Sequence, residues 1–143
     1  MSDDAALARL VRFYETLTPD TLAGELARVY APDASFKDPF NEVQGLDAIG
    51  AIFVHMFTRV AAPRFVVHVR MRQDMDAFLN WSMLFETDEG PMCIRGATHV
   101  QFDARGLVLM HRDYWDAAEE LYEKVPLLGA LMRFIKRRVM RSH

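Results

Sequence analysis

Cysteine is scarce in this sequence, because Cys93 is the only one among 143 residues. A single thiol excludes an internal disulfide, so the composition does not fit a small secreted domain and a cytoplasmic location is expected. Long apolar runs are also missing, since no stretch approaches the roughly 20 residues that a membrane-spanning helix needs. The acidic N-terminal stretch, MSDDAALARL, does not have the pattern of a signal peptide.

The sequence also lacks an excess of charge of one sign and the marks of a cofactor site. The formal net charge is -3 and the isoelectric point is near 5.9, so no nucleic-acid partner is expected. Zinc needs converging His, Cys or carboxylate ligands, and a lone cysteine without a helical pair of histidines four residues apart argues against a metal site. Gly45, Gly50 and Gly90 form no phosphate-binding loop. We therefore expect no metal and no cofactor.

A hydrophobic content of 51% is enough for one domain with a sizeable core. Three N-terminal segments repeat apolar residues at helical spacing, and Thr18 and Pro19 suit the N-cap and the first position of the second helix. A short extended piece, Ser35–Asp38, separates the second helix from the third. The predicted helices lie within residues 7–17, 19–30 and 49–57.

The pattern changes after Pro63 to apolar residues at every second position, which is typical of half-buried strands. Phe65, Val67, Val69 and Met71 form the first such row. Helices followed by hairpin-joined strands predict the α+β class, with a curved antiparallel sheet packed on three N-terminal helices around a pocket. Three further strands are predicted over about residues 79–86, 92–102 and 107–115.

Residues 117–143 are predicted to form a C-terminal helical extension, packed on a domain that spans residues 1–116. Pro126 divides this extension, and a basic cluster lies near its end. A basic end suits the dipole of a surface helix. Two other interpretations stay open, namely a lid over the pocket and a weak contact with a membrane surface.

The segment Tyr30–Phe40, YAPDASFKDPF, resembles the ketosteroid isomerase family of the SnoaL-like, NTF2-like superfamily, in which a Y-A-x-D-A-x-x-x-D-P-F stretch carries the catalytic base. The resemblance covers about residues 5–116 and implies an NTF2-like (cystatin-like) cone. It also implies that Asp38 is the base, that Tyr14 binds the developing enolate and that Tyr30 supports it. Trp115, at the end of the last predicted strand, would line the pocket.

Two positions depart from the family pattern. Thr98 stands where the family has a protonated aspartic acid, and Phe53 stands where it has a third tyrosine. A threonine can donate one hydrogen bond but is not an acid. Together with Tyr30, Trp81 and Trp115, these two residues are the predicted substrate-binding wall of the pocket.

His111, Asp113 and Trp115 lie two residues apart on the last predicted strand and therefore share one face. If Trp115 lines the pocket, the carboxylate and the imidazole lie there as well and can exchange protons with a ligand. Polyketide cyclases of the resembling superfamily use such a pocket aspartate to move a carbon-bound proton, which makes Asp113 a rival of Asp38. Structural interpretations stay open for both sites. Asp38 before Pro39 can cap a turn. His111 and Asp113 can lie at a dimer face instead of in the pocket.

The resulting hypothesis is a cofactor-independent proton-transfer enzyme of isomerase or cyclase type, with Asp38, Tyr14, Asp113 and His111 as the candidate catalytic residues. Its substrate would be a hydrophobic small molecule such as a steroid-, terpenoid- or polyketide-like carbonyl compound. Two alternatives stay open: a non-catalytic binding protein for a hydrophobic or lipid-like ligand, and a dimerising interaction module. The resemblance also leads us to expect a homodimer.

Overall fold

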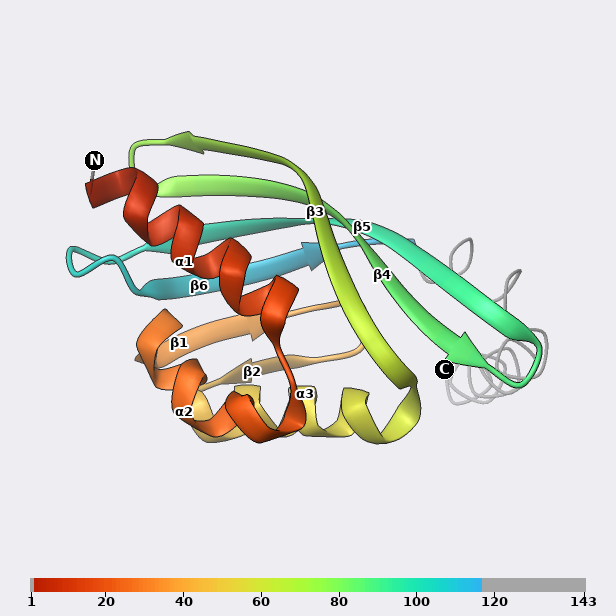
Figure 1. Cartoon of the computed structure of the whole chain (residues 1–143). Helices are drawn as coiled ribbons and strands as arrows, with labels where there is room; N and C mark the ends of the chain where they lie inside the picture. The colour runs from red at the N-terminus through yellow and green to blue at the C-terminus, as the bar shows by residue number, and fades with distance from the viewer. Residues whose placement is uncertain (1, 117–143) are drawn as a thin grey trace, which may run out of the picture.

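The computed structural model describes residues 2–116, which form three helices and six strands (Figure 1). The predicted α+β class is confirmed. The predicted extension over residues 117–143 lies outside the described residues. In chain order the elements are α1 (Ser2–Thr16), α2 (Pro19–Val29), β1 (Tyr30–Lys37), β2 (Glu42–Gln44), α3 (Leu46–Arg59), β3 (Ala61–Gln73), β4 (Asp76–Thr87), β5 (Gly90–Phe102) and β6 (Val108–Tyr114).

The local sequence determines where α2 begins. The Thr21 N–H donates to the Thr18 hydroxyl over 3.2 Å, and the Thr18 N–H donates to the Thr21 hydroxyl over 3.1 Å. This reciprocal pair satisfies backbone donors that a first helical turn leaves free, and Pro19 has no N–H to satisfy. The predicted N-cap is confirmed. At the other end the backbone becomes extended at Tyr30, so β1 begins there rather than at Ser35.

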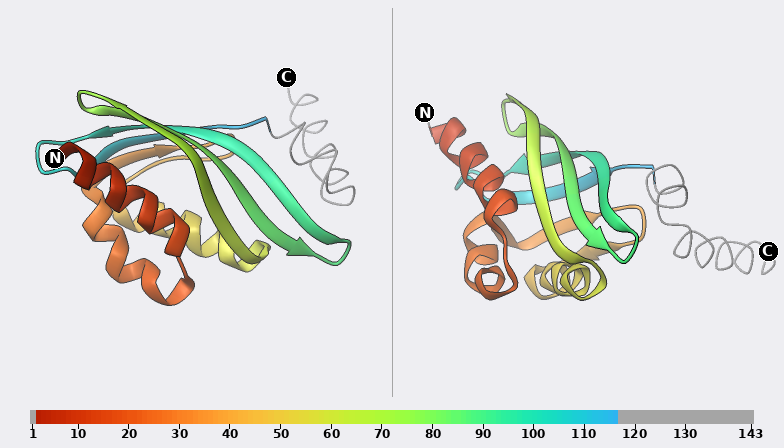
Figure 2. Two further views of the ribbon diagram at one scale, coloured as in Figure 1. Left: turned by 45° about the horizontal axis from the view of Figure 1, so that its top comes forward. Right: turned by 45° about the vertical axis from the view of Figure 1, so that its right-hand side comes forward.

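The six strands form one mixed sheet in the order β2-β1-β6-β5-β4-β3. Strands β3 to β6 pair in sequence as antiparallel neighbours, whereas β1 pairs with β6 in parallel. The parallel pair differs from the predicted antiparallel sheet because the chain leaves β1, crosses through α3 to the far edge and returns by hairpins. The helices lie on one side of the sheet, and β3, β4 and β5 bend across them (Figures 1 and 2).

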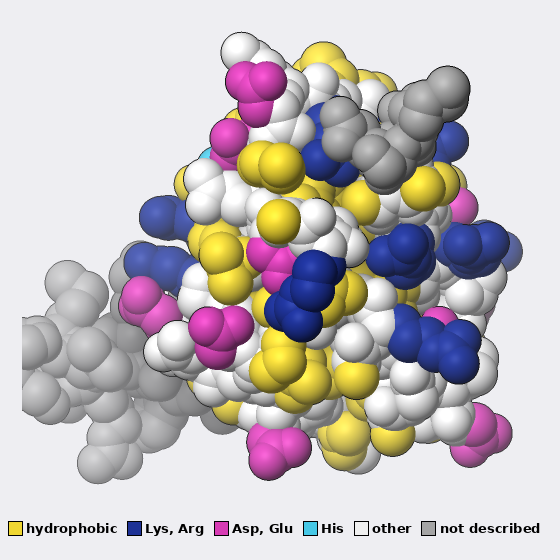
Figure 3. All heavy atoms as spheres, turned by 90° about the vertical axis from the view of Figure 1, so that its left-hand side faces the viewer, with side chains coloured by type: hydrophobic (Ala, Val, Ile, Leu, Met, Phe, Trp, Pro, Cys, Tyr) yellow, Lys and Arg dark blue, Asp and Glu magenta, His cyan; other side chains and the backbone are white. Residues whose placement is uncertain are grey.

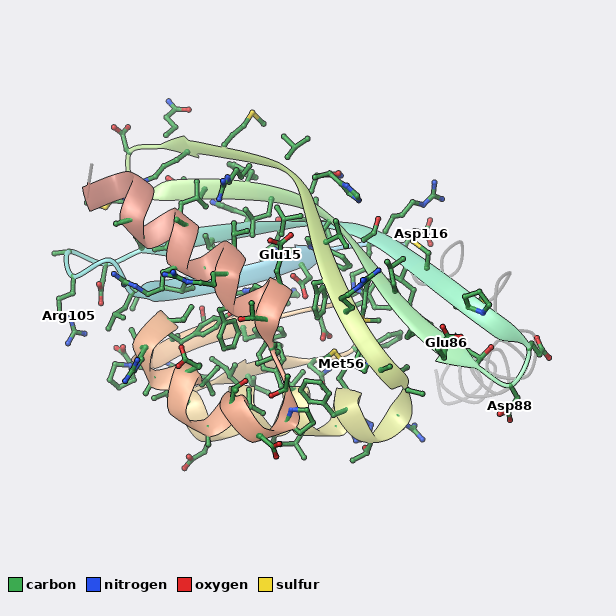
Figure 4. All side chains as sticks on the ribbon, viewed as in Figure 1. Glu15, Met56, Glu86, Asp88, Arg105 and Asp116 are labelled. Atoms are coloured by element: carbon green, nitrogen blue, oxygen red, sulfur yellow. The ribbon has the colours of Figure 1, made fainter. Side chains whose placement is uncertain are left out.

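A bulge in β3 changes the side of the sheet to which its apolar residues point. The register with β4 shifts between Val67 and Val69, so His68 is one residue too many for the ladder. The Val67 N–H donates to Glu15 Oε2 of α1 over 3.0 Å, and Figure 4 shows Glu15 beside β3. The prediction of one buried apolar face for this strand is wrong beyond the bulge. Val69 and Met71 are 49% and 62% exposed there.

The core lies between the helices and the concave face of the sheet. Apolar side chains from all three helices and from the inward positions of the strands pack together there. The side chains with no exposed surface include Leu10, Tyr30, Ile49, Val100 and Val108. Because the strands curve away from the helices beyond this packed region, the same concave face is free to line a cavity.

The outer face of the sheet leaves large apolar side chains in contact with solvent. Phe78 and Tyr114 are both about half exposed, and the Phe78 ring stacks on His99 with 4.4 Å between the centroids. His99 Nε2 in turn lies 2.6 Å from Asp76 Oδ1. Exposed apolar groups of this kind can support association between copies, and the homodimer stays a prediction. In the described part of the chain, no helix has the length and apolar character to cross a membrane.

Candidate active site

The concave face of the sheet and one face of α3 enclose a cavity of about 830 Å³. A space of this size can bury most of the surface of a drug-sized molecule. Polar groups in the wall are few, so their positions determine what the site can do. Aromatic and aliphatic side chains in the wall include Phe36, Phe53, Phe65, Leu79, Met83 and Ile94.

The structure brings most of the predicted site residues to this cavity. Tyr30 and His111 are outside its wall and lie behind it, with 0% and 2% of their surface exposed. The other predicted residues line the cavity, namely Tyr14, Asp38, Phe53, Trp81, Thr98, Asp113 and Trp115. Polar wall residues that the sequence did not indicate are Asn41, His55 and Arg59. Among residues 2–116, no three His, Cys, Asp or Glu side chains group together as metal ligands would.

The register of β5 and β6 places Asp113 opposite Thr98. The Thr98 hydroxyl donates to Asp113 Oδ1 over 2.6 Å, and His111 Nε2 lies 2.7 Å from the same oxygen. Trp81 Nε1–H donates to the Thr98 oxygen over 2.8 Å, which leaves the hydroxyl proton for the carboxylate. Within residues 2–116, Asp113 Oδ2 accepts no hydrogen bond. The carboxylate is therefore held in one orientation with one oxygen available to a ligand.

His111 connects Asp113 to two buried tyrosines. Its Nδ1 lies 2.8 Å from the Tyr30 hydroxyl and 3.3 Å from the Tyr14 hydroxyl, and the two hydroxyls are hydrogen-bonded to each other. An ionised carboxylate only accepts, so His111 Nε2–H donates to Asp113; a neutral ring then accepts from Tyr30, which accepts from Tyr14. The imidazole also stacks on Phe36, with 4.3 Å between centroids. These contacts form a continuous hydrogen-bonded chain from Tyr14 through Tyr30 and His111 to Asp113.

Asp38 lines the cavity and also holds the turn between β1 and β2. Its Oδ1 accepts the backbone N–H groups of Phe40 and Asn41, over 2.8 and 2.7 Å. The Asn41 side-chain amide donates to both carboxylate oxygens, over 3.1 and 3.2 Å. These are the contacts of a turn cap. Both oxygens of Asp38 are therefore engaged, which distinguishes it from Asp113.

The buried tyrosines make the folded protein sensitive to alkaline pH. Burial, and secondly the neighbouring Tyr30, hold the pKa of Tyr14 well above its ordinary value of 10.0, and burial likewise raises the pKa of Tyr30. The folded chain keeps these protons when the unfolded chain loses them. Stability is therefore unaffected below about pH 10 and falls as the pH rises above it. In a spectrophotometric titration, we expect Tyr14 and Tyr30 to ionise only as the protein unfolds.

Two variants show which tyrosines account for the delayed ionisation. Tyr14→Phe should reduce the delayed step by one tyrosine, because Tyr30 stays buried. Tyr114→Phe, which removes an exposed tyrosine, should leave the delayed step unchanged. If substitution of Tyr14 or Tyr30 instead removed a step near pH 10, while the far-ultraviolet circular dichroism spectrum stayed intact, this placement of the two tyrosines would be wrong.

Gly96 of β5 has no side chain, and two tryptophans occupy the space where its Cβ would lie. A Cβ at this position would lie 2.6 Å from Trp81 Cζ2 and 3.1 Å from Trp115 Cβ. Gly96→Ala should therefore displace Trp81 from Thr98 and cost about 1–3 kcal/mol of unfolding free energy. Urea denaturation and tryptophan fluorescence measure both effects. Gly24→Ala in α2, where a Cβ meets nothing within 4 Å, is the control; equal stability of the two variants would refute the close approach.

Several solved structures share this fold at low sequence identity. An NTF2-like protein of unknown function from Burkholderia pseudomallei is 19% identical, with a TM-score of 0.71 over 84% of this chain and 96% of its own. An LEH-like epoxide hydrolase from M. tuberculosis is 14% identical, with a TM-score of 0.72 over 92% of this chain and 98% of its own. A Catenulispora acidiphila protein with a ketosteroid isomerase-like fold, in complex with trimethylamine, is 11% identical, with a TM-score of 0.69 over 83% and 91%.

The sequence itself matches one family. A comparison with curated proteins gives no significant match. Residues 10–111, which include Tyr14, Asp38, Thr98 and His111, match the SnoaL-like domain. The predicted resemblance is thereby confirmed, and the structural similarities agree in showing the NTF2-like fold. The chain belongs to the SnoaL-like domain family.

Proposed function

We propose that this SnoaL-like protein is a cofactor-independent acid–base enzyme of isomerase or cyclase type, which moves a proton on a hydrophobic small molecule. The observation that carries the proposal is the carboxylate of Asp113 in the wall of an apolar cavity. Its Oδ1 is bound by Thr98 and His111, while Oδ2 accepts no hydrogen bond from residues 2–116. A base fixed beside its substrate contributes typically about 10²–10⁴-fold to the rate.

The proposed reaction balances without a co-reactant. Asp113 Oδ2 accepts a proton from the carbon between the carbonyl and the C=C bond of a β,γ-unsaturated substrate, and the C–H electron pair becomes part of a dienolate. The same carboxyl group then returns the proton to the γ-carbon of the dienolate, so the C=C bond moves next to the carbonyl and the isomerisation is complete. The hydrogen bonds from Thr98 and His111 keep the carboxyl group in place through both steps. The apolar wall limits water that would exchange the proton.

Two other predicted residues fit the role of base or helper less well. Asp38 lines the cavity, but turn amides occupy both its oxygens. Tyr14 also lines the cavity, but its hydroxyl is already hydrogen-bonded to Tyr30 and lies 3.3 Å from His111 Nδ1, so a bond to an enolate would compete with these contacts. We therefore assign the base to Asp113 and a turn-holding role at the cavity wall to Asp38.

The test is turnover of a substrate panel by the wild-type chain, Asp113→Asn and Asp38→Asn. The panel contains enones and cyclisable polyketides, and it includes epoxides because the LEH-like epoxide hydrolase shares this fold. The proposal predicts an activity that Asp113→Asn loses and Asp38→Asn largely keeps. The reverse pattern would assign the base to Asp38. Ligand binding without any turnover would favour the non-catalytic binding protein.

A further inference from the structure

We infer that the cavity accepts hydrophobic molecules that carry an acid group, and that Arg59 binds this group at the cavity rim. The inference rests on the proposed function only in taking the cavity as the substrate site, and it adds the class of substrate. Arg59 is the one arginine or lysine in the described part of the cavity wall. It is also exposed to solvent, which places it at the rim rather than deep inside.

The cavity-lining face of α3 changes from apolar to polar along the helix. His55 and Arg59 lie one turn apart at the C-terminal end of this stripe, and the cavity-lining residues before them are apolar. Met56 belongs to the same stripe and lies between α3 and β3 in the view of Figure 4. An elongated ligand along α3 would meet hydrocarbon first and a guanidinium at its end. The stripe consists of Ala48, Ala51, Ile52, Phe53, His55, Met56 and Arg59.

Arg59 has no carboxylate partner in the described part of the chain, since no ion pair there includes it. The two carboxylates of the cavity wall are held by other groups, Asp38 by turn amides and Asp113 through its Oδ1 by Thr98 and His111, so neither is paired with Arg59. An anionic group is repelled by a carboxylate and attracted by a guanidinium. The acid group therefore belongs at the rim, with the apolar part of the ligand directed toward Asp113.

The helix dipole explains part of this arrangement. A cation in the last turn of a helix is favoured, and Arg59 is in the last turn of α3. The dipole acts on every face of the helix, however, so it does not explain why the cation lies on the cavity side next to His55. A role in binding an acid group accounts for this position, because a guanidinium can form two parallel hydrogen bonds with a carboxylate or sulfonate.

A second cationic surface supplies the control. Arg9, Arg12 and Arg28 line a groove of about 690 Å³ between α1 and α2, which shares no lining residue with the cavity. Figure 3 shows dark blue Lys and Arg side chains spread among magenta Asp and Glu side chains on one face of the molecule. The affinity of an anion bound in this groove would not depend on Arg59. A substitution in the groove therefore distinguishes binding there from binding in the cavity.

Two fluorescent probes of similar shape test the inference with the full chain. Anilinonaphthalenesulfonate is an apolar acid, and N-phenylnaphthylamine lacks the acid group. We expect Arg59→Ala to weaken sulfonate binding roughly tenfold, as for loss of a hydrogen bond to a charged group, and to leave the Kd of the uncharged probe unchanged. Arg12→Ala is the matched control and should change neither constant. Asp113→Asn should keep the preference for the acid.

The inference is overturned if Arg59→Ala has no effect, if it weakens both probes equally, or if Arg12→Ala causes the loss instead. Failure of both probes to bind would overturn it as well. None of these outcomes concerns proton transfer, which turnover by Asp113→Asn tests separately. A wild-type protein without any turnover that keeps the Arg59-dependent preference would refute the proposed function and retain the inference.

Discussion

Asp113→Asn is expected to lower kcat on any isomerisable substrate by about 10²–10⁴-fold, the usual contribution of a positioned base. Asparagine has nearly the same shape, and its remaining oxygen can still accept hydrogen bonds from Thr98 and His111. The amide nitrogen would then take the place of Oδ2 and cannot accept a proton. The measurement is kcat and KM under steady-state conditions, with thermal unfolding recorded alongside.

Comparison with Asp38→Asn gives this experiment its specificity. Asp38 is the second carboxylate of the same cavity, so its substitution changes the charge of the wall by the same amount. We expect a smaller change in kcat, together with a loss of stability, because amides donate to both of its oxygens. Full activity of a folded Asp113→Asn protein would disprove the assignment of the base.

His111→Ala is expected to cost about 3–5 kcal/mol of unfolding free energy, the largest effect on stability among these variants. The substitution removes a side chain that is 2% exposed and leaves a void against Phe36. It also removes the acceptor of the Tyr30 hydroxyl and a donor to Asp113. Urea denaturation monitored by circular dichroism measures the loss, which should appear as a lower midpoint at constant slope.

Tyr30→Phe isolates one part of this network. Phenylalanine keeps the packing of the ring and removes the hydroxyl that donates to His111. The expected cost is about 1 kcal/mol for one buried hydrogen bond. If His111→Ala cost no more than Tyr30→Phe, the imidazole could not be the central member of the network.

Hydrophobic spacing predicts most of the fold because burial of one face imposes a period on each element. The start of α2 is also local, since the hydroxyls of Thr18 and Thr21 are close in sequence. The start of β1 depends less on neighbouring residues in the sequence. Pro32 disfavours a helical Ala31, but the strand begins at Tyr30, which pairs with a residue of β6 far along the chain. The parallel pairing of β1 with β6 has no signal in either segment.

The candidate site is predictable to the same extent. Strand alternation puts His111 and Asp113 on one face, and their hydrogen bond confirms it. The contact of Tyr30 with His111 joins residues 81 positions apart and depends on packing that no local pattern encodes. Arg59 escapes prediction for another reason. An amphipathic pattern identifies the apolar side of a helix, whereas a rim residue is polar and still faces inward.

The inserted residue at His68 shifts the phase of β3 by half a period. Val67, before it, lines the cavity, while Val69 and Met71, after it, lie on the exposed face of the sheet. One alternating row of apolar residues thus contributes to both faces of the sheet. Glu15, 52 positions before Val67, accepts the hydrogen bond of the Val67 N–H next to the bulge. We therefore expect a substitution of Glu15 to alter the cavity wall at Val67 and the exposed apolar surface at Val69 and Met71 together.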